Sequence, residues 1–207
     1  MKKIGLKALA LVLALLLGAC AFAEAAEGTA LAFETFRETY AKHTQEAWEQ
    51  EETGLIRSLE PGEGVTVSLC LAGENVAALT VEFPCGVLSD AVRAAVESLG
   101  WLSEEELAAA FSLEENAELE TETFRVYRIH GDNRDSIAVC PVADAENMLW
   151  QPIHGGKKIH DRPRCSGMDV SRMITQEAAE ELGWEDCGTC RKSRKEETPE
   201  QKSEQEP

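Results

Sequence analysis

Basic residues are scarce in this chain. Its 207 residues carry 20 Lys and Arg against 38 Asp and Glu, which gives a formal net charge of −18. A surface this acidic repels the phosphate backbone of nucleic acids and the anionic headgroups of lipids. Nucleic acid is therefore not an expected partner, although 43% hydrophobic residues are enough for a core of ordinary size.

Familiar catalytic motifs are also missing. The sequence has no phosphate-cradling glycine loop, no serine nucleophile elbow and no H-E-x-x-H pair. Its acid-rich stretches, such as Glu104–Glu106, lack the spaced carboxylates of an EF-hand loop, and we expect them to be solvated faces of helices. These absences lead us to favour a protein that is not an enzyme.

The hydrophobic run at the N-terminus is too short for a typical membrane-spanning helix. Residues 8–23 are apolar and follow a basic start, whereas a spanning helix needs about 20 such residues. The pattern predicts a signal peptide over residues 1–23. The segment ending in Cys20 resembles a bacterial lipobox, which implies lipidation of Cys20 and anchoring on the outer face of a membrane. Ala21-Phe22-Ala23 resembles an ordinary cleavage site, which would release a secreted protein, and both readings predict an extracytoplasmic location.

Residues 27–145 are predicted to form one α+β domain. Apolar residues recur at helical spacing over residues 31–58, which predicts a long helix, with a break near Gly54 left open. Alternating segments and turn residues predict two β-hairpins, and capping residues predict two further helices. The hairpin strands are expected at 65–71 with 76–83 and at 123–130 with 136–142, and the helices at 89–99 and 103–111. This order predicts a small antiparallel sheet with helices on one face.

The composition changes at Gln151. Residues 151–190 are rich in His, Cys, Gly and Pro and poor in large aliphatic side chains, so we expect a small module that cannot make a core of its own. Within it, Thr175 is a plausible N-cap for a helix at 176–182, and Gly183 follows the helix at the position where glycine is favoured. Residues 191–207 are dense in charge and lack aliphatic and aromatic residues, which predicts a disordered tail.

The C-terminal module carries four potential metal ligands in two pairs. His160 precedes Cys165 by five positions, and Cys187-x2-Cys190 follows after 21 intervening residues. One imidazole and three thiols form the donor set that zinc takes in tetrahedral structural sites. The alternative is a disulfide between Cys187 and Cys190, or between Cys165 and one of them, because an extracytoplasmic compartment can be oxidising. We favour the metal because the histidine and both spacings fit a zinc site together.

These residues also carry a resemblance. The run HDRPRCSGM over residues 160–168, with the TQEAA helix start and the final CGTC, resembles a small zinc-binding module found at the C-termini of bacterial extracytoplasmic proteins. The layout is loosely similar to the zinc domain of Ada-type DNA-methyl repair proteins, which use four cysteines. The resemblance implies a zinc cofactor bound by His160, Cys165, Cys187 and Cys190.

Three further cysteines lie in apolar stretches of the first domain: Cys70, Cys85 and Cys140. Burial as free thiols is the default expectation for all three, and one disulfide among them stays open. Cys85, next to a predicted helix N-terminus, is a candidate nucleophile, with His130 as its base and Asp132 or Asp135 to orient the imidazole.

These observations leave three functional hypotheses of different class. We favour a lipid-anchored, non-catalytic binding or structural protein with an unidentified extracytoplasmic partner, because four protein ligands fill the zinc shell and leave no position for substrate. The first alternative is an enzyme, either a Cys85/His130 thiol hydrolase or a zinc-thiolate alkyl acceptor. The second alternative is a zinc sensor or carrier, in which the metal would exchange readily.

Overall fold

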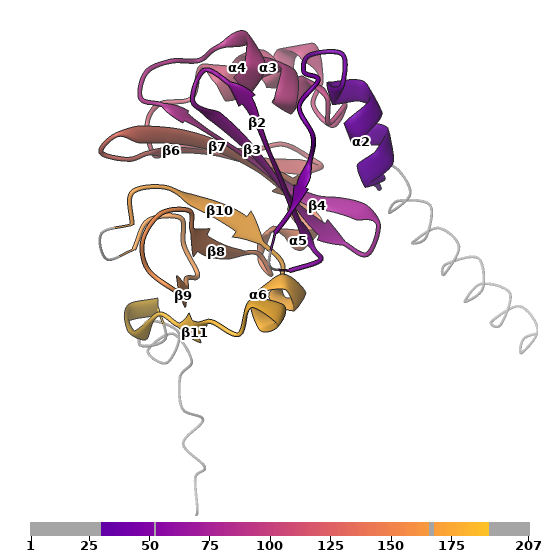
Figure 1. Cartoon of the computed structure of the whole chain (residues 1–207). Helices are drawn as coiled ribbons and strands as arrows, with labels where there is room; N and C mark the ends of the chain where they lie inside the picture. Colours follow the sequence, from indigo (N-terminus) through magenta and orange to yellow (C-terminus); the bar gives the residue numbers. More distant parts are fainter. Residues whose placement is uncertain (1–29, 52, 166–167, 191–207) are drawn as a thin grey trace, which may run out of the picture. The chain divides into compact units, whose positions relative to one another are not determined.

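A computed structural model of the protein describes residues 30–51, 53–165 and 168–190 (Figure 1). The predicted signal peptide, Cys20 and the charged tail at 191–207 lie outside the described residues. From Leu31 onward the described residues belong to one compact unit. Within them, no helix is both long and apolar enough to cross a membrane.

A seven-stranded sheet is the centre of the fold, and all its neighbouring strands pair antiparallel in the order β1-β2-β3-β4-β7-β6-β5. The predicted α+β class is confirmed, and the sheet is larger than the small one expected. Its strands have the following bounds: β1 Glu49–Gln50, β2 Ile56–Gly62, β3 Val65–Ala72, β4 Asn75–Pro84, β5 Glu118–Glu120, β6 Phe124–His130 and β7 Arg134–Pro141.

Both predicted hairpins are present, because their sequences combine apolar strands with suitable turns. Strands β3 and β4 meet at a turn in which Gly73 adopts a φ of +61°, a conformation that glycine enters without steric cost. In β4 every residue from Val76 to Phe83 is buried, since other elements cover both faces of the sheet.

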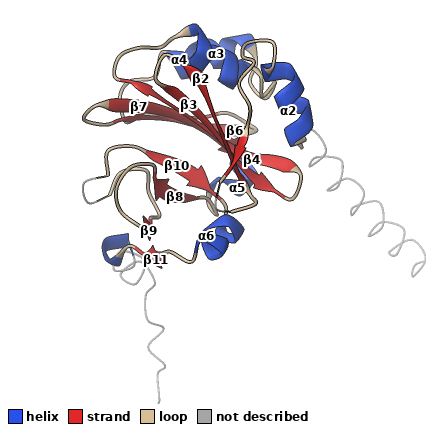
Figure 2. Ribbon diagram, in the orientation of Figure 1, coloured by secondary structure: helices blue, strands red, loops and turns tan. Residues whose placement is uncertain are grey.

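One face of the sheet is covered by α2 (Phe33–Tyr40), α3 (Asp90–Glu97) and α4 (Glu104–Phe111), as Figure 2 shows. Their apolar sides enclose a core of Val, Leu, Ile and Phe side chains from the central strands. The predicted capping box is confirmed: the Ser103 hydroxyl accepts a hydrogen bond from the Glu106 backbone N–H, and the Glu106 carboxylate accepts one from Ser103 N–H.

The predicted long helix at 31–58 is wrong. Among the described residues of this stretch, only Phe33–Tyr40 is an α-helix; the chain then turns back, and residues 56–62 form β2. The aromatic residues that gave the helical period instead form a cluster in which Trp48, on the returning segment, packs against Phe33 and Phe36 of α2. Pairing of β2 with β3 decides this outcome, because tertiary hydrogen bonding overrides a modest local helix preference.

The opposite face of the sheet is covered by the C-terminal segment. Strands β8 (Leu149–Pro152) and β10 (Ser171–Ile174) pair antiparallel, and β10 lies against β4. Two helices flank them, α5 (Val142–Ala145) and α6 (Gln176–Leu182), and α6 confirms the predicted helix with its Thr175 N-cap and left-handed Gly183. Side chains of sheet and C-terminal segment share one buried cluster. The division into domains at 27–145 and 151–190 stays a prediction. The buried cluster contains residues from both parts.

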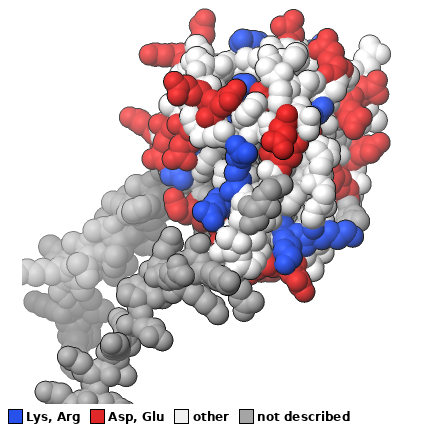
Figure 3. All heavy atoms as spheres, turned by 90° about the vertical axis from the view of Figure 1, so that its left-hand side faces the viewer, with Lys and Arg blue, Asp and Glu red and all other residues white. Residues whose placement is uncertain are grey.

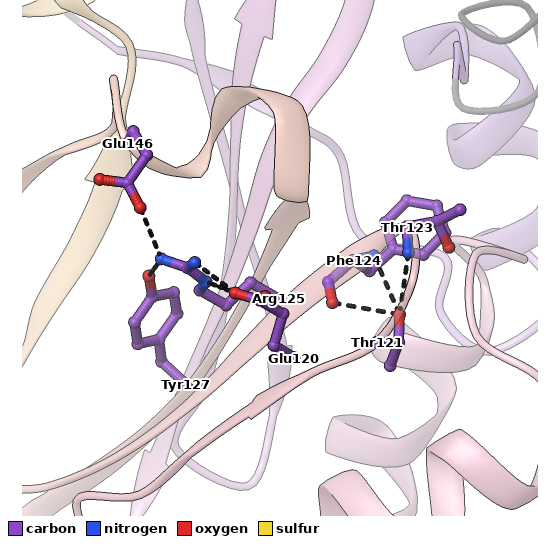
Figure 4. A network of polar contacts seen from close by, with 7 residues as sticks. All are labelled: Glu120, Thr121, Thr123, Phe124, Arg125, Tyr127 and Glu146. Atoms are coloured by element: carbon purple, nitrogen blue, oxygen red, sulfur yellow. Dashed lines mark hydrogen bonds and ion pairs between the residues drawn. The ribbon is translucent and has the colours of Figure 1, made fainter.

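The short edge strand β5, whose Leu119 packs against the core, is also held by polar side-chain contacts. Arg125 on β6 pairs with Glu120 on β5, and its guanidinium lies 3.2 Å from a Glu146 carboxylate oxygen and 3.4 Å from the Tyr127 hydroxyl (Figure 4). The Thr121 hydroxyl accepts a hydrogen bond from the Phe124 backbone N–H across the connecting turn. Polar contacts produce no regular repeat of apolar residues along the chain, and the sequence therefore does not predict this strand.

Candidate metal centre

His160, Cys165, Cys187 and Cys190 converge on one point. Their potential ligand atoms all lie within 4.8 Å of one another, and all four residues are buried. The Cys165 sulfur lies 3.7 Å from that of Cys187 and 3.6 Å from that of Cys190, and His160 Nδ1 lies 3.9 Å from Cys190 Sγ. The predicted convergence of one imidazole and three thiols is present, and the cluster could hold a metal ion.

The spacing of the sulfurs distinguishes a metal site from a disulfide. Two thiolates bound at about 2.3 Å to a tetrahedral ion lie about 3.8 Å apart, whereas disulfide sulfurs lie about 2.05 Å apart. None of the three cysteines is in a disulfide, and the two S···S distances given above fit the edge of the tetrahedron. The donor atoms present therefore fit a four-coordinate ion.

Backbone pairing places the ligands. His160 exchanges two backbone hydrogen bonds with Trp150, of 2.8 and 2.9 Å, which fixes it beside β8. Strand β9 (Lys158–Ile159) pairs parallel with β11 (Glu185–Asp186), and the Cys187 N–H then donates to the Ile159 carbonyl at 2.8 Å. Helix α6 carries the chain back between the two halves of the site, as the spacing predicted.

The local electrostatics favour the metal-binding form of two ligands, Cys187 and His160, and oppose it at Cys190. Backbone N–H groups of Cys190 and Thr189, in the helical turn after Cys187, donate to the Cys187 sulfur and lower the pKa of its thiol to about 7. Burial raises the pKa of Cys190 to about 11, and burial lowers the pKa of His160. The imidazole is therefore neutral at pH 7, the form in which histidine binds metal.

Arg162 is a neighbour of the cluster that the sequence reasoning missed. Its guanidinium donates a hydrogen bond to the Cys165 sulfur and lies near that of Cys190, and this raises the pKa of the arginine. Three thiolates around a divalent ion leave an excess negative charge, which an adjacent cation balances. The sequence shows that Arg162 lies between two predicted ligands. The direction of its side chain, however, depends on how the loop from His160 to Cys165 folds.

The surface around this loop is locally basic in an otherwise acidic protein. Lys and Arg side chains gather in the lower half of the face drawn in Figure 3, and acidic side chains crowd the upper half. Four basic residues flank His160 and Cys165 in the sequence: Lys157, Lys158, Arg162 and Arg164. A surface hollow of about 640 Å³ is lined by His160, Cys187 and residues of the loop that precedes His160. Lys157 and Lys158 line the same hollow, and Arg162 donates to the Cys165 sulfur.

Cys85, the candidate nucleophile, lies close to its predicted base and to a carboxylate that orients the base. Cys85, His130 and Asp135 place potential ligand atoms within 4.8 Å of one another, and Asp135 rather than Asp132 binds the imidazole, at 2.7 Å. Cys85 is half-buried, and its sulfur donates to the Gly131 carbonyl at 3.7 Å. Partial burial and the Asp135 carboxylate raise the pKa of Cys85, which opposes formation of a thiolate nucleophile.

The other two cysteines of the first domain have structural surroundings. Cys70 and Cys140 are buried free thiols, which confirms the default expectation for them. The Cys70 sulfur accepts a hydrogen bond from the Thr175 N–H at 3.3 Å and so joins β3 to the start of α6.

Comparisons with known proteins identify no relative. No family model, no curated protein and no solved structure matches this chain. The resemblance to a small zinc module therefore rests on the motif and on the convergence of its four ligands.

Proposed function

We propose that this protein is an extracytoplasmic, lipid-anchored, non-catalytic protein whose C-terminal segment is held in shape by a zinc ion. The observation that carries the proposal is the convergence of His160, Cys165, Cys187 and Cys190 in a buried cluster with tetrahedral spacing. Zinc is the metal we assign, because three thiolates and one neutral imidazole form a preferred tetrahedral donor set for this ion.

A structural role follows from the number of ligands. Four protein donors fill a tetrahedral shell, and no position is left for a substrate or for an activated water. The cysteine sulfurs belong to residues that are at most 5% exposed, which also disfavours an alkyl acceptor that must meet its substrate. When bound, zinc would cross-link the loop at His160 and Cys165 to the C-terminal turn at Cys187 and Cys190.

The proposed location rests on the N-terminal residues alone. The basic start, the apolar run and Cys20 after two small residues support lipidation and anchoring on the outer face of a membrane. Labelling of the bacterial protein with a fatty-acid analogue tests this point. We expect Cys20→Ala to abolish the label; a wild-type chain without label would overturn the anchor and leave a secreted protein.

The zinc proposal is tested by metal analysis of the purified protein and by unfolding with and without a chelator. We expect one tightly held zinc per chain, lost in Cys187→Ser, and a lower unfolding temperature after chelation. The matched control is Cys140→Ala, a buried cysteine outside the site, which should keep its zinc although it loses stability.

Two outcomes would replace this proposal by an alternative. An apo protein that stays fully folded and regains zinc within seconds would indicate a sensor or carrier. Stoichiometric transfer of an alkyl group to one zinc-bound cysteine would indicate an acceptor of the Ada kind. A protein that holds no metal and contains a disulfide between two of the three cysteines would contradict the zinc site itself.

A further inference from the structure

We propose that Cys85, His130 and Asp135 form a second, exchangeable binding site for a thiophilic divalent cation such as Zn²⁺. The three residues lie together at one end of the large sheet, at the end of β4 and beside the β6–β7 turn (Figure 1). This site is independent of the C-terminal cluster, with which it shares no residue.

The sheet itself holds the three residues in place. Asp135 on β7 is paired in register both with Phe83 on β4 and with His130 on β6. The chain leaves β4 at Pro84, and the Cys85 N–H bonds to the Asn133 carbonyl in the β6–β7 turn at 3.4 Å. His130 and Asp135 therefore lie on paired strands, and Cys85 is tied by its backbone to the turn between them, which limits the movement of all three residues.

The two carboxylate oxygens of Asp135 have different partners, and one of them is available as a ligand. Its Oδ2 accepts hydrogen bonds from the Gly86 N–H at 3.1 Å and from Arg128 at 3.0 Å. Its Oδ1 faces His130 Nδ1 at 2.7 Å. The ligand oxygen is thus oriented by two donors on its far side, which is the usual arrangement of a metal-bound carboxylate.

The surroundings carry an excess of negative charge. A Glu115 carboxylate oxygen lies 3.7 Å from His130 Nδ1, and the negative charge of Asp169 also acts on Cys85. Arg128 pairs with Asp135 at 3.0 Å and offsets part of this charge. A bound divalent ion would balance the remaining negative charge.

The same contacts argue against a thiol hydrolase at this place. In such an enzyme the imidazole takes the proton of the thiol, but the Cys85 sulfur donates to the Gly131 carbonyl and lies beside the Asp135 carboxylate. Both neighbours favour the protonated thiol. A metal ion removes the unfavourable contact between a thiolate and a carboxylate, because it takes the place of the thiol proton. The Cys85 sulfur and the Asp135 carboxylate would then both bind the ion.

Binding at this site releases one proton to the solvent. The Cys85 S–H bond breaks and a sulfur–metal bond forms, while the neutral imidazole keeps one proton on the nitrogen that does not bind the ion. Three protein ligands leave an open coordination position, and both Cys85 and His130 are partly exposed. These features predict faster exchange than at the buried four-ligand cluster.

The test is equilibrium dialysis of the protein against Zn²⁺, followed by metal analysis. We expect two equivalents in the wild-type chain and one in Cys85→Ser. We also expect His130→Gln to bind the second equivalent at least about 100-fold more weakly, because loss of an outer-shell partner alone weakens metal binding 10–100-fold. Asp132→Asn, which changes an exposed acid in the same turn, is the matched control and should keep both equivalents.

The design separates this inference from the proposed function. Cys187→Ser removes the equivalent at the C-terminal cluster, and Cys85→Ser removes the equivalent at the sheet. If the C-terminal site holds no metal, the equivalent that depends on Cys85 remains measurable. A wild-type chain that binds no equivalent dependent on Cys85, or a second equivalent that persists in Cys85→Ser, overturns the inference.

Discussion

The two faces of the large sheet are stabilised in different ways. Toward the helices, β4 presents Leu79, Val81 and Phe83, and this face closes over a core made of hydrophobic side chains. Toward the C-terminal segment, the same strand presents Ala78, Thr80 and Glu82, so buried polar side chains lie beside a second apolar cluster there. One strand therefore faces an apolar core on one side and a layer of mixed apolar and polar side chains on the other.

The polar layer is organised by specific contacts between distant parts of the chain. The Thr80 hydroxyl accepts a hydrogen bond from the Met173 N–H at 3.1 Å, which ties β10 to the sheet. Arg172 donates to both carboxylate oxygens of Glu51 at 2.6 Å and to Gln151 at 2.7 Å. The proposed zinc cross-link would add to the stability of this face beyond these polar contacts.

The largest expected effect is loss of metal at the C-terminal cluster. Structural zinc contributes on the order of 10 kcal/mol or more of apparent folding free energy to a small module. We expect chelation to raise hydrogen exchange strongly in residues 158–190 and only slightly in β3, β4 and α3. Exchange measured by mass spectrometry checks this; an equal rise on both faces would remove the contrast between them.

A pair of neighbouring substitutions on β4 sharpens the comparison. Leu79→Ala opens a cavity in the helix-covered core and should lower the free energy of unfolding by about 2–5 kcal/mol. Thr80→Ala removes the acceptor for Met173 and should lower it by about 1–3 kcal/mol. Chemical denaturation gives both values. We also expect Thr80→Ala, and not Leu79→Ala, to weaken zinc binding at the C-terminal cluster, since it loosens β10.

Acid should loosen the polar face through Glu51. Burial raises the pKa of Glu51, but hydrogen bonds and the charge of Arg172 lower it on balance. A carboxylate with a lowered pKa adds stability above its ordinary pKa of about 4, and that stability is lost as the pH falls through the lowered value. Unfolding temperatures between pH 7 and pH 2 should show this loss in wild type and less of it in Glu51→Gln, whereas Glu49→Gln, on the exposed β1, should behave like wild type.

The smallest effects are expected at two helix caps, one on each side of the sheet. Ser103→Ala and Thr175→Ala each remove an N-cap hydroxyl, at a cost of about 1 kcal/mol. The Ser103 change should not alter metal binding. The Thr175 change should also weaken binding at the C-terminal cluster by a small factor, because α6 joins Cys165 to Cys187. Equal metal affinities in the two variants would contradict this coupling.

The sequence predicted elements wherever local rules were strong. The hairpin around Gly73, the capping box at Ser103 and the helix after Thr175 all follow from turn and capping chemistry within a few residues. The prediction failed between residues 31 and 58, where aromatic residues at helical spacing belong to a helix and to the segment that folds back over it. Periodicity alone cannot distinguish one helical face from such a cluster.

By itself, the sequence determined the donor set of the C-terminal cluster, because His160, Cys165, Cys187 and Cys190 carry their chemistry and spacing in the chain. Tertiary structure alone decided that Arg162 stands beside the thiols, that the C-terminal segment packs on the sheet, and that Cys85 meets His130 and Asp135. The physical reason is range: ligand type and short spacing are local properties, whereas these contacts depend on the register of strands distant in the sequence.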